Sequence, residues 1–350
     1  MHTSVRPLSP GASTSGAQRA SHRNTVPYGG TAPSVATVPF VVTVPCVVTI
    51  AGTDPTGGAG SAADIKSIHA AGGYALPVTT AVLAQNSSRV THIEHMSAAV
   101  VRAQLDAIAE HARINAVKIG MLGTAENVQA VAEWLSEARP QLIVVDPVMI
   151  SSSGTALIAP EAFPEVAALC AAADVITPNA LELAELTGSS LAKNHIDVCN
   201  QARAWAERHG NVVIAKTGHL DSEQTTNYWI ESGAEPIAIH TQRVESSATQ
   251  GTGCALASAL TTRLAAGDAP ARALAWASDW LHHAISHGER LDVTLAQDPP
   301  VSGPMDHFHH VRAAMPQPHI PQPHIPQAQV PQSPGPLQLG SGARNGGGSR

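Results

Sequence analysis

Charged and aromatic side chains are scarce in this sequence of 350 residues: Asp, Glu, Lys and Arg make up 13%, and Phe, Trp and Tyr only 3%. Aliphatic residues must therefore supply the interior, and because the AVILMFWYC set reaches 43%, a substantial aliphatic core is expected. Lys and Arg number 20 against 27 Asp and Glu, which gives a net charge of −7. This balance lacks the basic surface that binds a phosphate backbone, so we expect no nucleic-acid partner.

Cysteine is rare and long apolar runs are missing. The cysteines stand at four positions, Cys46, Cys170, Cys199 and Cys254. They form no CxxC pair, so they are typical neither of a disulfide framework nor of a zinc site, and they favour a reducing compartment. The longest apolar stretch, residues 39–50, is interrupted by Pro45 and is too short to span a bilayer. We therefore expect a cytoplasmic protein without a membrane segment.

The two ends of the sequence differ in composition from its middle. Residues 1–44 are dominated by Ser, Thr, Gly, Pro and Ala without apolar periodicity, and residues 313–350 carry a Pro/His repeat followed by glycines. Neither segment has enough apolar residues to offset the entropy lost on ordering. We predict a disordered arm on each side of one folded domain over residues 45–312.

Short β-branched runs alternate with longer helical patterns inside this domain. Six runs are predicted strands: residues 47–50, 78–83, 116–119, 142–145, 175–177 and 212–215. Each is almost wholly apolar, as expected for a parallel sheet that is covered on both faces. Helices are predicted from Ser97 and over Thr124–Glu137, because each begins at a residue suited to an N-cap. The pattern indicates an α/β domain with a mostly parallel central sheet and helices on both faces.

The segment Gly251, Thr252, Gly253 and Cys254 precedes a helix of small residues. Its glycines leave backbone N–H groups unpaired at a helix N-terminus, which is a favourable place for anionic oxygen. Such a cradle favours phosphoryl transfer, which depends on donors aimed at developing charge. In the first turn, Cys254 is predicted to have its thiolate favoured by the helix dipole and to act as a base. The alternative for Cys254 is a small buried apolar residue.

Polar residues also stand where three of the predicted strands end. Asp146 follows residues 142–145, Asn179 and Glu182 follow residues 175–177, and Lys216 ends the last strand. Sites in open α/β sheets lie at the carboxyl ends of the strands. Carboxylates there suit Mg²⁺ held partly through water, and a lysine offsets phosphate charge. The alternative is ordinary loop capping and solvated charge.

The loop AGTDPTGGAG directly follows the first predicted strand. Gly58, Gly60 and Ala63 match the GxGxxA dinucleotide pattern loosely, but the loop is too long and no acid stands about 20 residues beyond it. A GxxxxGK[ST] phosphate loop is absent. Asp64 is either an acid in the first helical turn that offsets the helix dipole or a ligand for substrate.

With these segments in order, the sequence resembles the hydroxymethylpyrimidine/phosphomethylpyrimidine kinases of thiamine biosynthesis, which belong to the ribokinase-like superfamily. The strings that carry the resemblance are, in order, VVTIAGTDPTGGAG, AAGGYALPVTTAVLAQN, KIGML, VVDPVM, ITPNALE, AKTGHL, TQGTGC and GPMDHFHH. They cover nearly all of the predicted domain and neither arm. The resemblance implies a three-layer α/β fold and a homodimer. It also implies transfer of the γ-phosphoryl of Mg-ATP, first to the hydroxymethyl oxygen of 4-amino-5-hydroxymethyl-2-methylpyrimidine and then to the resulting monophosphate.

The resemblance also implies roles for individual residues. The pyrimidine would lie among Gly52, Asp64, Gln85, Met121 and Val148. Residues 251–254 would form the anion hole, with Cys254 near the attacking hydroxyl. Asn179, Lys216 and Thr249 would contact the nucleotide, and Asp146 and Glu182 would hold Mg²⁺. The sequence departs from the family pattern at Ser61, Ala62, Ser152 and Gln250, near the substrate loops and the phosphates.

Two other functions remain open at this point. A pyridoxal kinase would share the fold, the anion hole and Mg-ATP but would accept a different heteroaromatic alcohol. A non-catalytic pyrimidine-binding protein would keep the pocket without the transfer, and the GTGC segment speaks against it.

Overall fold

The computed structural model describes residues 44–151, 154–220, 223–294 and 302–315. Most of both predicted arms, and Ser152, lie outside these residues. The last helix, α9 (His309–Ala314), continues across the domain boundary expected after residue 312. Within the described ranges, no helix combines the length and the apolar character needed to cross a membrane.

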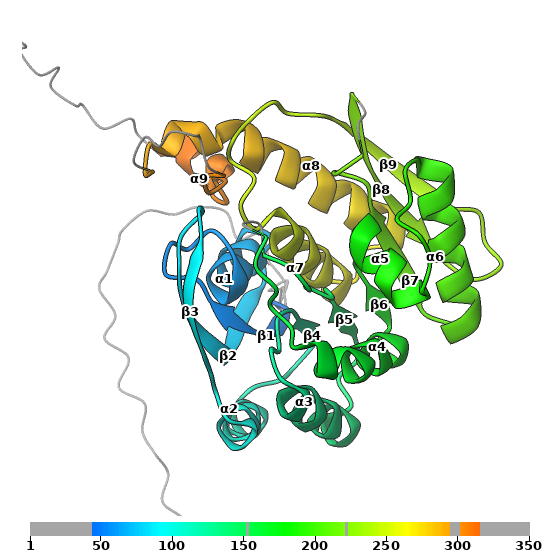
Figure 1. Cartoon of the computed structure of the whole chain (residues 1–350). Coiled ribbons are helices and arrows are strands. Elements are labelled where there is room, and N and C mark those ends of the chain that lie inside the picture. The colour runs from blue at the N-terminus through cyan, green and yellow to red at the C-terminus, as the bar shows by residue number, and fades with distance from the viewer. Residues whose placement is uncertain (1–43, 152–153, 221–222, 295–301, 316–350) are drawn as a thin grey trace, which may run out of the picture. The chain divides into compact units, whose positions relative to one another are not determined.

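The described strands form a single sheet with the order β3-β2-β1-β4-β5-β6-β7-β8-β9 (Figure 1). Their bounds are β1 Cys46–Thr53, β2 Tyr74–Gln85, β3 Val90–His95, β4 Ala116–Ile119, β5 Ile143–Val145, β6 Val175–Ile176, β7 Val212–Lys216, β8 Gln224–Ile230 and β9 Ile237–Gln242. In the sheet, β2, β1, β4, β5, β6 and β7 pair in parallel with their neighbours. The antiparallel pairs are β2 with β3, β7 with β8, and β8 with β9. The chain moves outward in one direction from β1 to β2 and in the other from β4 to β7. The strand order therefore reverses between β1 and β4, which is where open α/β sheets bind ligands.

The six predicted strands are confirmed and correspond to β1, β2, β4, β5, β6 and β7. The sequence did not lead us to predict β3, β8 and β9. β3 and β9 are the two edges of the sheet, and β8 lies between β7 and β9; β3 is mostly exposed, and β9 has no buried residue. Their residues are therefore mixed polar and apolar, as in VTHIEH, and lack the continuous apolar run of a central parallel strand.

Helices cover both faces of the sheet (Figure 1). Their bounds are α1 Gly60–Ala70, α2 Ala98–His111, α3 Ala125–Ala138, α4 Phe163–Ala172, α5 Ala180–Thr187, α6 His195–His209, α7 Thr252–Ala265 and α8 Pro270–Gly288, with short 3₁₀ turns at Pro160–Ala162 and Glu289–Leu291. The predicted caps are confirmed. The Ser97 side chain accepts from the backbone N–H of Val100 at the start of α2, and Thr124 accepts from that of Asn127 at the start of α3.

The core is divided by the sheet into two layers of aliphatic side chains. On one face, α2 to α6 pack against residues such as Val48, Ile50 and Ile119. On the other face, α1 packs around Val47, and α7 and α8 pack around Ile214. Successive residues of β1 therefore point to opposite layers, both of them buried. This arrangement confirms the expected three-layer α/β fold.

Candidate active site

The loop after β1 lies directly against the turn that begins α7. Asp54 holds the two segments together, and its side chain is only 4% exposed. Its Oδ1 accepts from the backbone N–H of Thr56 at 2.9 Å, and its Oδ2 accepts from the backbone N–H of Ala59 at 2.8 Å. Gln250 Nε2 donates to the same Oδ2 at 3.0 Å. Gln250, which departs from the family pattern, therefore ties the α7 turn to the loop.

Gly251 is the N-cap of α7 and has a φ of +73°. A Cβ atom on Gly251 would stand 2.0 Å from the carbonyl oxygen of Gly58, so only glycine fits where the two loops touch. Thr252, Gly253 and Cys254 follow as the first helical turn. The first N–H groups of a helix have no partner within it and concentrate its positive dipole end. Residues 251–254 therefore form the start of α7, as expected, and their role as an anion cradle stays a prediction.

A lysine and two carboxylates lie beside this cradle. Lys216 Nζ is 2.9 Å from Asp146 Oδ1 and 3.9 Å from Glu182 Oε2. A Cβ atom built on Gly253 would stand 3.2 Å from Lys216 Nζ and 3.9 Å from Asp146 Oδ2. Residues from the ends of β5, β6 and β7 therefore converge on the first turn of α7. Lys216 and the two carboxylates thus lie close to the N–H groups at the start of α7. Such a combination is suited to a phosphate and its counterion.

The charges in this group shift one another. Burial opposes ionisation of Asp146, but Lys216 and Lys118 outweigh it and lower the pKa of this carboxyl. Burial also opposes the charge on Lys216, yet Asp146 and Glu182 raise the pKa of its ammonium. Burial raises the pKa of Glu182 to about 7, although Lys216 works against the rise. Lys216 and Asp146 therefore favour their charged forms, whereas the buried Glu182 carboxyl holds its proton more readily than an exposed one.

Asn179 and Glu182 have a structural function that the sequence also allowed. The Asn179 side chain accepts from the backbone N–H groups of Leu181 and Glu182, both at 2.9 Å. Glu182 Oε2 in turn accepts from the backbone N–H of Asn179 at 2.8 Å. This capping box starts α5 and fixes the Glu182 carboxylate near Lys216. The Oδ1 atom of Asn179 is thereby committed to the helix.

Cys254 does not have the ionisation that we predicted. Burial raises the pKa of its thiol to about 12, and Asp64 and Asp146 raise it further, whereas Lys118 and a hydrogen bond from the Gly60 backbone lower it. The prediction of a thiolate base is therefore wrong, because desolvation outweighs the helix dipole. At neutral pH Cys254 is a thiol, and it is able to donate a weak hydrogen bond.

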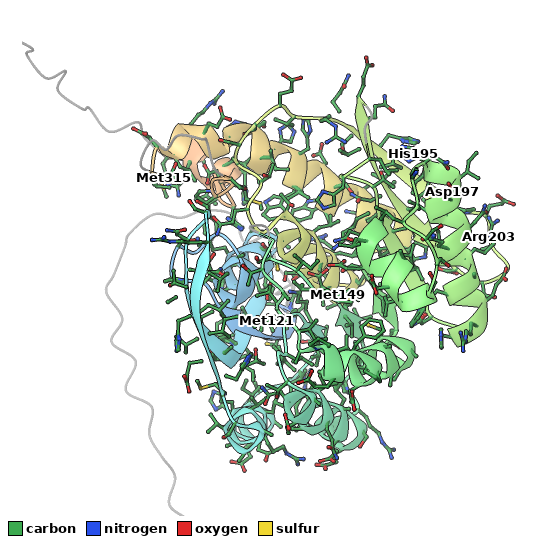
Figure 2. The ribbon with its side chains drawn as sticks, viewed as in Figure 1. Met121, Met149, His195, Asp197, Arg203 and Met315 are labelled. Carbon is green, nitrogen blue, oxygen red and sulfur yellow. The ribbon has the colours of Figure 1, made fainter. Side chains whose placement is uncertain are left out.

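Three of the residues expected around the pyrimidine lie together. A Cβ atom on Gly52 would stand 2.8 Å from Leu83 Cδ1 and 3.2 Å from Met121 Sδ, and Val148 packs against the same apolar cluster. Met121, labelled in Figure 2, comes from the loop that follows β4. Gln85 is two residues beyond Leu83 at the end of β2 and is half-buried. These residues line the same end of the sheet as the anion cradle.

Asp64 is placed differently from both expectations. Its side chain is fully buried, and α1 has no acid in its first turn. Its oxygens accept from Thr49, Lys118 and Ser258 at 2.6 to 3.1 Å. The first-turn interpretation is therefore wrong. All the oxygens of Asp64 are engaged within the protein, so the structure does not offer this carboxylate to a ligand.

Thr249 lies at the other margin of the turn. Its side chain is exposed, and its hydroxyl is 3.0 Å from Ser302 Oγ. Thr249 thus remains accessible immediately before Gln250.

The profile of the phosphomethylpyrimidine kinase family matches residues 54–299. The chain belongs to this family. Over 261 residues it is 38% identical to the hydroxymethylpyrimidine/phosphomethylpyrimidine kinase of Rhizobium meliloti, covering 74% of this chain and 96% of that protein. Over 277 residues it is 40% identical to the thiamine biosynthesis multifunctional protein ThiED of Corynebacterium efficiens, covering 77% of this chain and 37% of that protein. The chain thus spans little more than a third of that multifunctional relative.

The fold of this chain is also similar to that of a solved pyridoxal kinase. An ADP complex of Bacillus subtilis pyridoxal kinase aligns with a TM-score of 0.67 at 26% identity, over 77% of this chain and all of that one. The resemblance inferred from the sequence strings, and the fold it implied, are confirmed.

One buried residue of this phosphomethylpyrimidine kinase homologue received no role from the sequence. Lys118 is completely buried in β4 and pairs with Asp64. The sequence does indicate that Lys118 has a buried partner, because a lysine inside the run AVKI of a central parallel strand has to be neutralised. The identity of that partner, 54 positions away in the sequence, required the fold.

Proposed function

We propose that this chain is an ATP-dependent kinase of thiamine biosynthesis. It phosphorylates the hydroxymethyl oxygen of 4-amino-5-hydroxymethyl-2-methylpyrimidine and then phosphorylates the monophosphate to the diphosphate. The name of the Rhizobium meliloti relative, nearly all of which this chain covers, supports these substrates. The observation that carries the proposal is that Lys216 and Asp146 face Gly253 of the GTGC turn so closely that a Cβ there would meet both, at the same sheet end as the apolar cluster around Met121.

The transferred phosphoryl group would be held by the N–H groups of residues 251–254. Lys216 would lie along the phosphates and offset their charge, and the accessible Thr249 would contact the nucleotide. Asn179 would act on the nucleotide site mainly through the capping box that holds Glu182 beside Lys216. These donors are fixed by the fold before the substrate binds, so little reorganisation is needed as charge develops.

In the transfer step, the hydroxymethyl oxygen forms a bond to the γ-phosphorus. The bond between this phosphorus and the bridging oxygen breaks, and its electron pair remains on ADP. Because the transition state is loose, little charge develops on the attacking oxygen, and a strong base is not required. This agrees with Cys254 being a thiol, with a pKa of about 12. We assign Cys254 as a neutral hydrogen-bond donor beside the acceptor alcohol, and the proton of that alcohol passes to an oxygen of the transferred phosphoryl group as the new O–P bond forms.

Mg²⁺ fits the carboxylates beside the turn. Asp146 Oδ2 is buried and has no hydrogen-bond partner, and it faces the position of Gly253. Among the described residues, no group of three His, Cys, Asp or Glu side chains holds a metal by itself. Mg²⁺ is commonly bound by one or two carboxylates together with phosphate oxygens and water. Asp146 and Glu182 would hold the ion, which would neutralise charge on the phosphates.

The pyrimidine ring would pack on the apolar surface of Gly52, Met121 and Val148. Gln85 would contact its polar edge, because a side-chain amide both donates and accepts hydrogen bonds and matches an aminopyrimidine. Asp64 takes no part in this contact, since its oxygens are engaged inside the protein.

Pyridoxal kinase activity is the second candidate, and it is favoured by the similarity to the Bacillus subtilis pyridoxal kinase structure. Purified protein should be incubated with Mg-ATP and either the hydroxymethylpyrimidine or pyridoxal, and the products separated by mass spectrometry. We expect pyrimidine monophosphate followed by diphosphate. Exclusive phosphorylation of pyridoxal would favour the second function. Absence of turnover with both alcohols would favour a non-catalytic binding protein.

We also propose that the protein is a cytoplasmic homodimer whose folded part is flanked by disordered arms. The dimer follows from the family resemblance, and all four cysteines are free, as expected in a reducing compartment. Light scattering during size-exclusion chromatography tests the dimer, for which twice the chain mass is expected. Removal of residues 1–43 and 316–350 tests the arms, and the melting temperature should stay nearly unchanged. A large decrease would show that an arm packs on the fold.

A further inference from the structure

A buried ion pair joins the centre of the sheet to the helix layer beneath the proposed active site. Lys118 of β4 and Asp64 of α1 both have completely buried side chains, and Lys118 Nζ is 2.9 Å and 3.1 Å from the two Asp64 oxygens. Burying two charges costs much of what their attraction returns, so such a pair is weak evidence for a stabilising role. Its position in this fold points to another role.

The remaining hydrogen-bonding capacity of Asp64 is used by two other elements. Thr49 Oγ1 of β1 donates to Oδ2 at 2.6 Å, and Ser258 Oγ of α7 donates to Oδ1 at 2.8 Å. Both hydroxyl residues are completely buried. The network therefore connects β1, β4, α1 and α7 at one carboxylate. A fully satisfied buried network of this kind specifies one arrangement of the elements it joins.

Ser258 lies four residues after Cys254, on the same face of α7. The bond to Asp64 therefore acts on α7 one turn below the proposed anion cradle. The other end of the network reaches the apolar cluster: a Cβ atom on Gly120, the residue before Met121, would stand 3.0 Å from Lys118 Nζ. The pair thus lies between the turn that would hold the phosphoryl group and the loop that would contact the pyrimidine.

We propose that the Asp64–Lys118 pair is a positioning element that fixes the first turn of α7 relative to β4, acting through Ser258. The inference rests on the proposed function, because it assigns the phosphoryl group to that turn. Asp64 and Lys118 are not catalytic residues, because both side chains are completely buried and cannot touch the substrate. The pair sets the distance between the donors of the turn and the acceptor alcohol.

The fold provides a matched pair of substitutions to test this. Ser258→Ala removes the bond between Asp64 and α7, and Thr49→Val removes a bond to the same carboxylate from the sheet. A displacement of the donors by a fraction of an ångström is enough for Ser258→Ala to lower kcat about tenfold. Thr49→Val should change kcat less than about twofold, because the turn stays in place.

A second measurement does not depend on activity. Cys254 is half-buried, so its alkylation by iodoacetamide, followed by peptide mass spectrometry, reports how accessible the first turn leaves the thiol. Loss of one buried hydrogen bond to α7 should speed this reaction about fivefold in Ser258→Ala. Thr49→Val should alkylate at nearly the rate of the unaltered chain. If Ser258→Ala does not fold, Ser258→Cys, a weaker donor of similar size, takes its place.

Equal effects of the two substitutions on both kcat and alkylation would overturn the proposal. If the unaltered chain phosphorylates no alcohol but Ser258→Ala still speeds alkylation of Cys254, the proposed function is refuted and the positioning element stands. Normal kinase activity and alkylation in Ser258→Ala would refute the positioning element alone.

Discussion

Gly251→Ala is expected to damage the site far more than it damages the fold. The left-handed backbone at Gly251, with a φ of +73°, costs an alanine about 1 kcal/mol. The added Cβ would also stand 2.0 Å from the Gly58 carbonyl oxygen and 2.9 Å from Ala59 Cα. Since real Cβ contacts with an oxygen rarely fall below 3 Å, the two loops have to separate by about 1 Å. A misplacement of this size costs about 10²-fold in rate.

Gly267→Ala is the matched control for this substitution. Gly267 follows the other end of α7 with a φ of +89°, and a Cβ atom there would meet nothing within 4 Å. It should therefore lose about 1 kcal/mol of unfolding free energy with kcat unchanged. The assay is phosphoryl transfer from ATP to the hydroxymethylpyrimidine, together with urea unfolding of both variants. Equal kcat values for the two variants would refute the argument that contact between the loops sets the geometry of the turn.

Three further substitutions test the chemistry of the site and the burial of its surroundings. Lys216→Met should lower kcat by a factor of about 10² to 10³, because a charged donor is lost. Lys193→Met, at an exposed position, should leave kcat unchanged. Equal kcat values for the two variants would show that Lys216 does not act in the site. Cys254→Ala should lower kcat about 10²-fold without moving the pH profile, and near-normal turnover would reduce the thiol to packing. Burial lowers the pKa of His307 to about 4, so the folded chain binds fewer protons than the unfolded one between pH 6.5 and 4. His307 alone should therefore lower the unfolding free energy by up to about 3 kcal/mol as pH decreases through this window. Urea unfolding of His307→Asn should lack this contribution, whereas His92→Gln should retain it.

The sequence predicted the secondary structure correctly where local residues alone determine it, as in buried strands and helix caps. Apolar runs such as residues 116–119 indicate strands covered on both faces, and Ser97 and Thr124 each cap the helix that they precede. The edge strands β3 and β9, and β8 beside β9, were missed because a strand that is not fully buried mixes polar and apolar residues. Local sequence cannot separate such strands from loops.

The site was harder to predict, because its properties depend on contacts that are distant in sequence. Residues 251–254 could be recognised as a helix start. The burial that keeps Cys254 protonated comes from loops almost 200 residues away, and the partner of Asp64 is a lysine on another strand. Gln250 was seen only as a departure from the family pattern, whereas its bond to Asp54 is what joins the two loops.

The central claim is that the amides of residues 251–254 hold the γ-phosphoryl group beside Lys216 and Asp146. A crystal structure of the full chain with Mg²⁺, a non-hydrolysable ATP analogue and the hydroxymethylpyrimidine tests it most directly. We expect the γ-phosphorus at the first turn of α7, with the hydroxymethyl oxygen facing it from the side of Met121. A γ-phosphate bound away from that turn, or a pyrimidine bound away from the Met121 cluster, would contradict it.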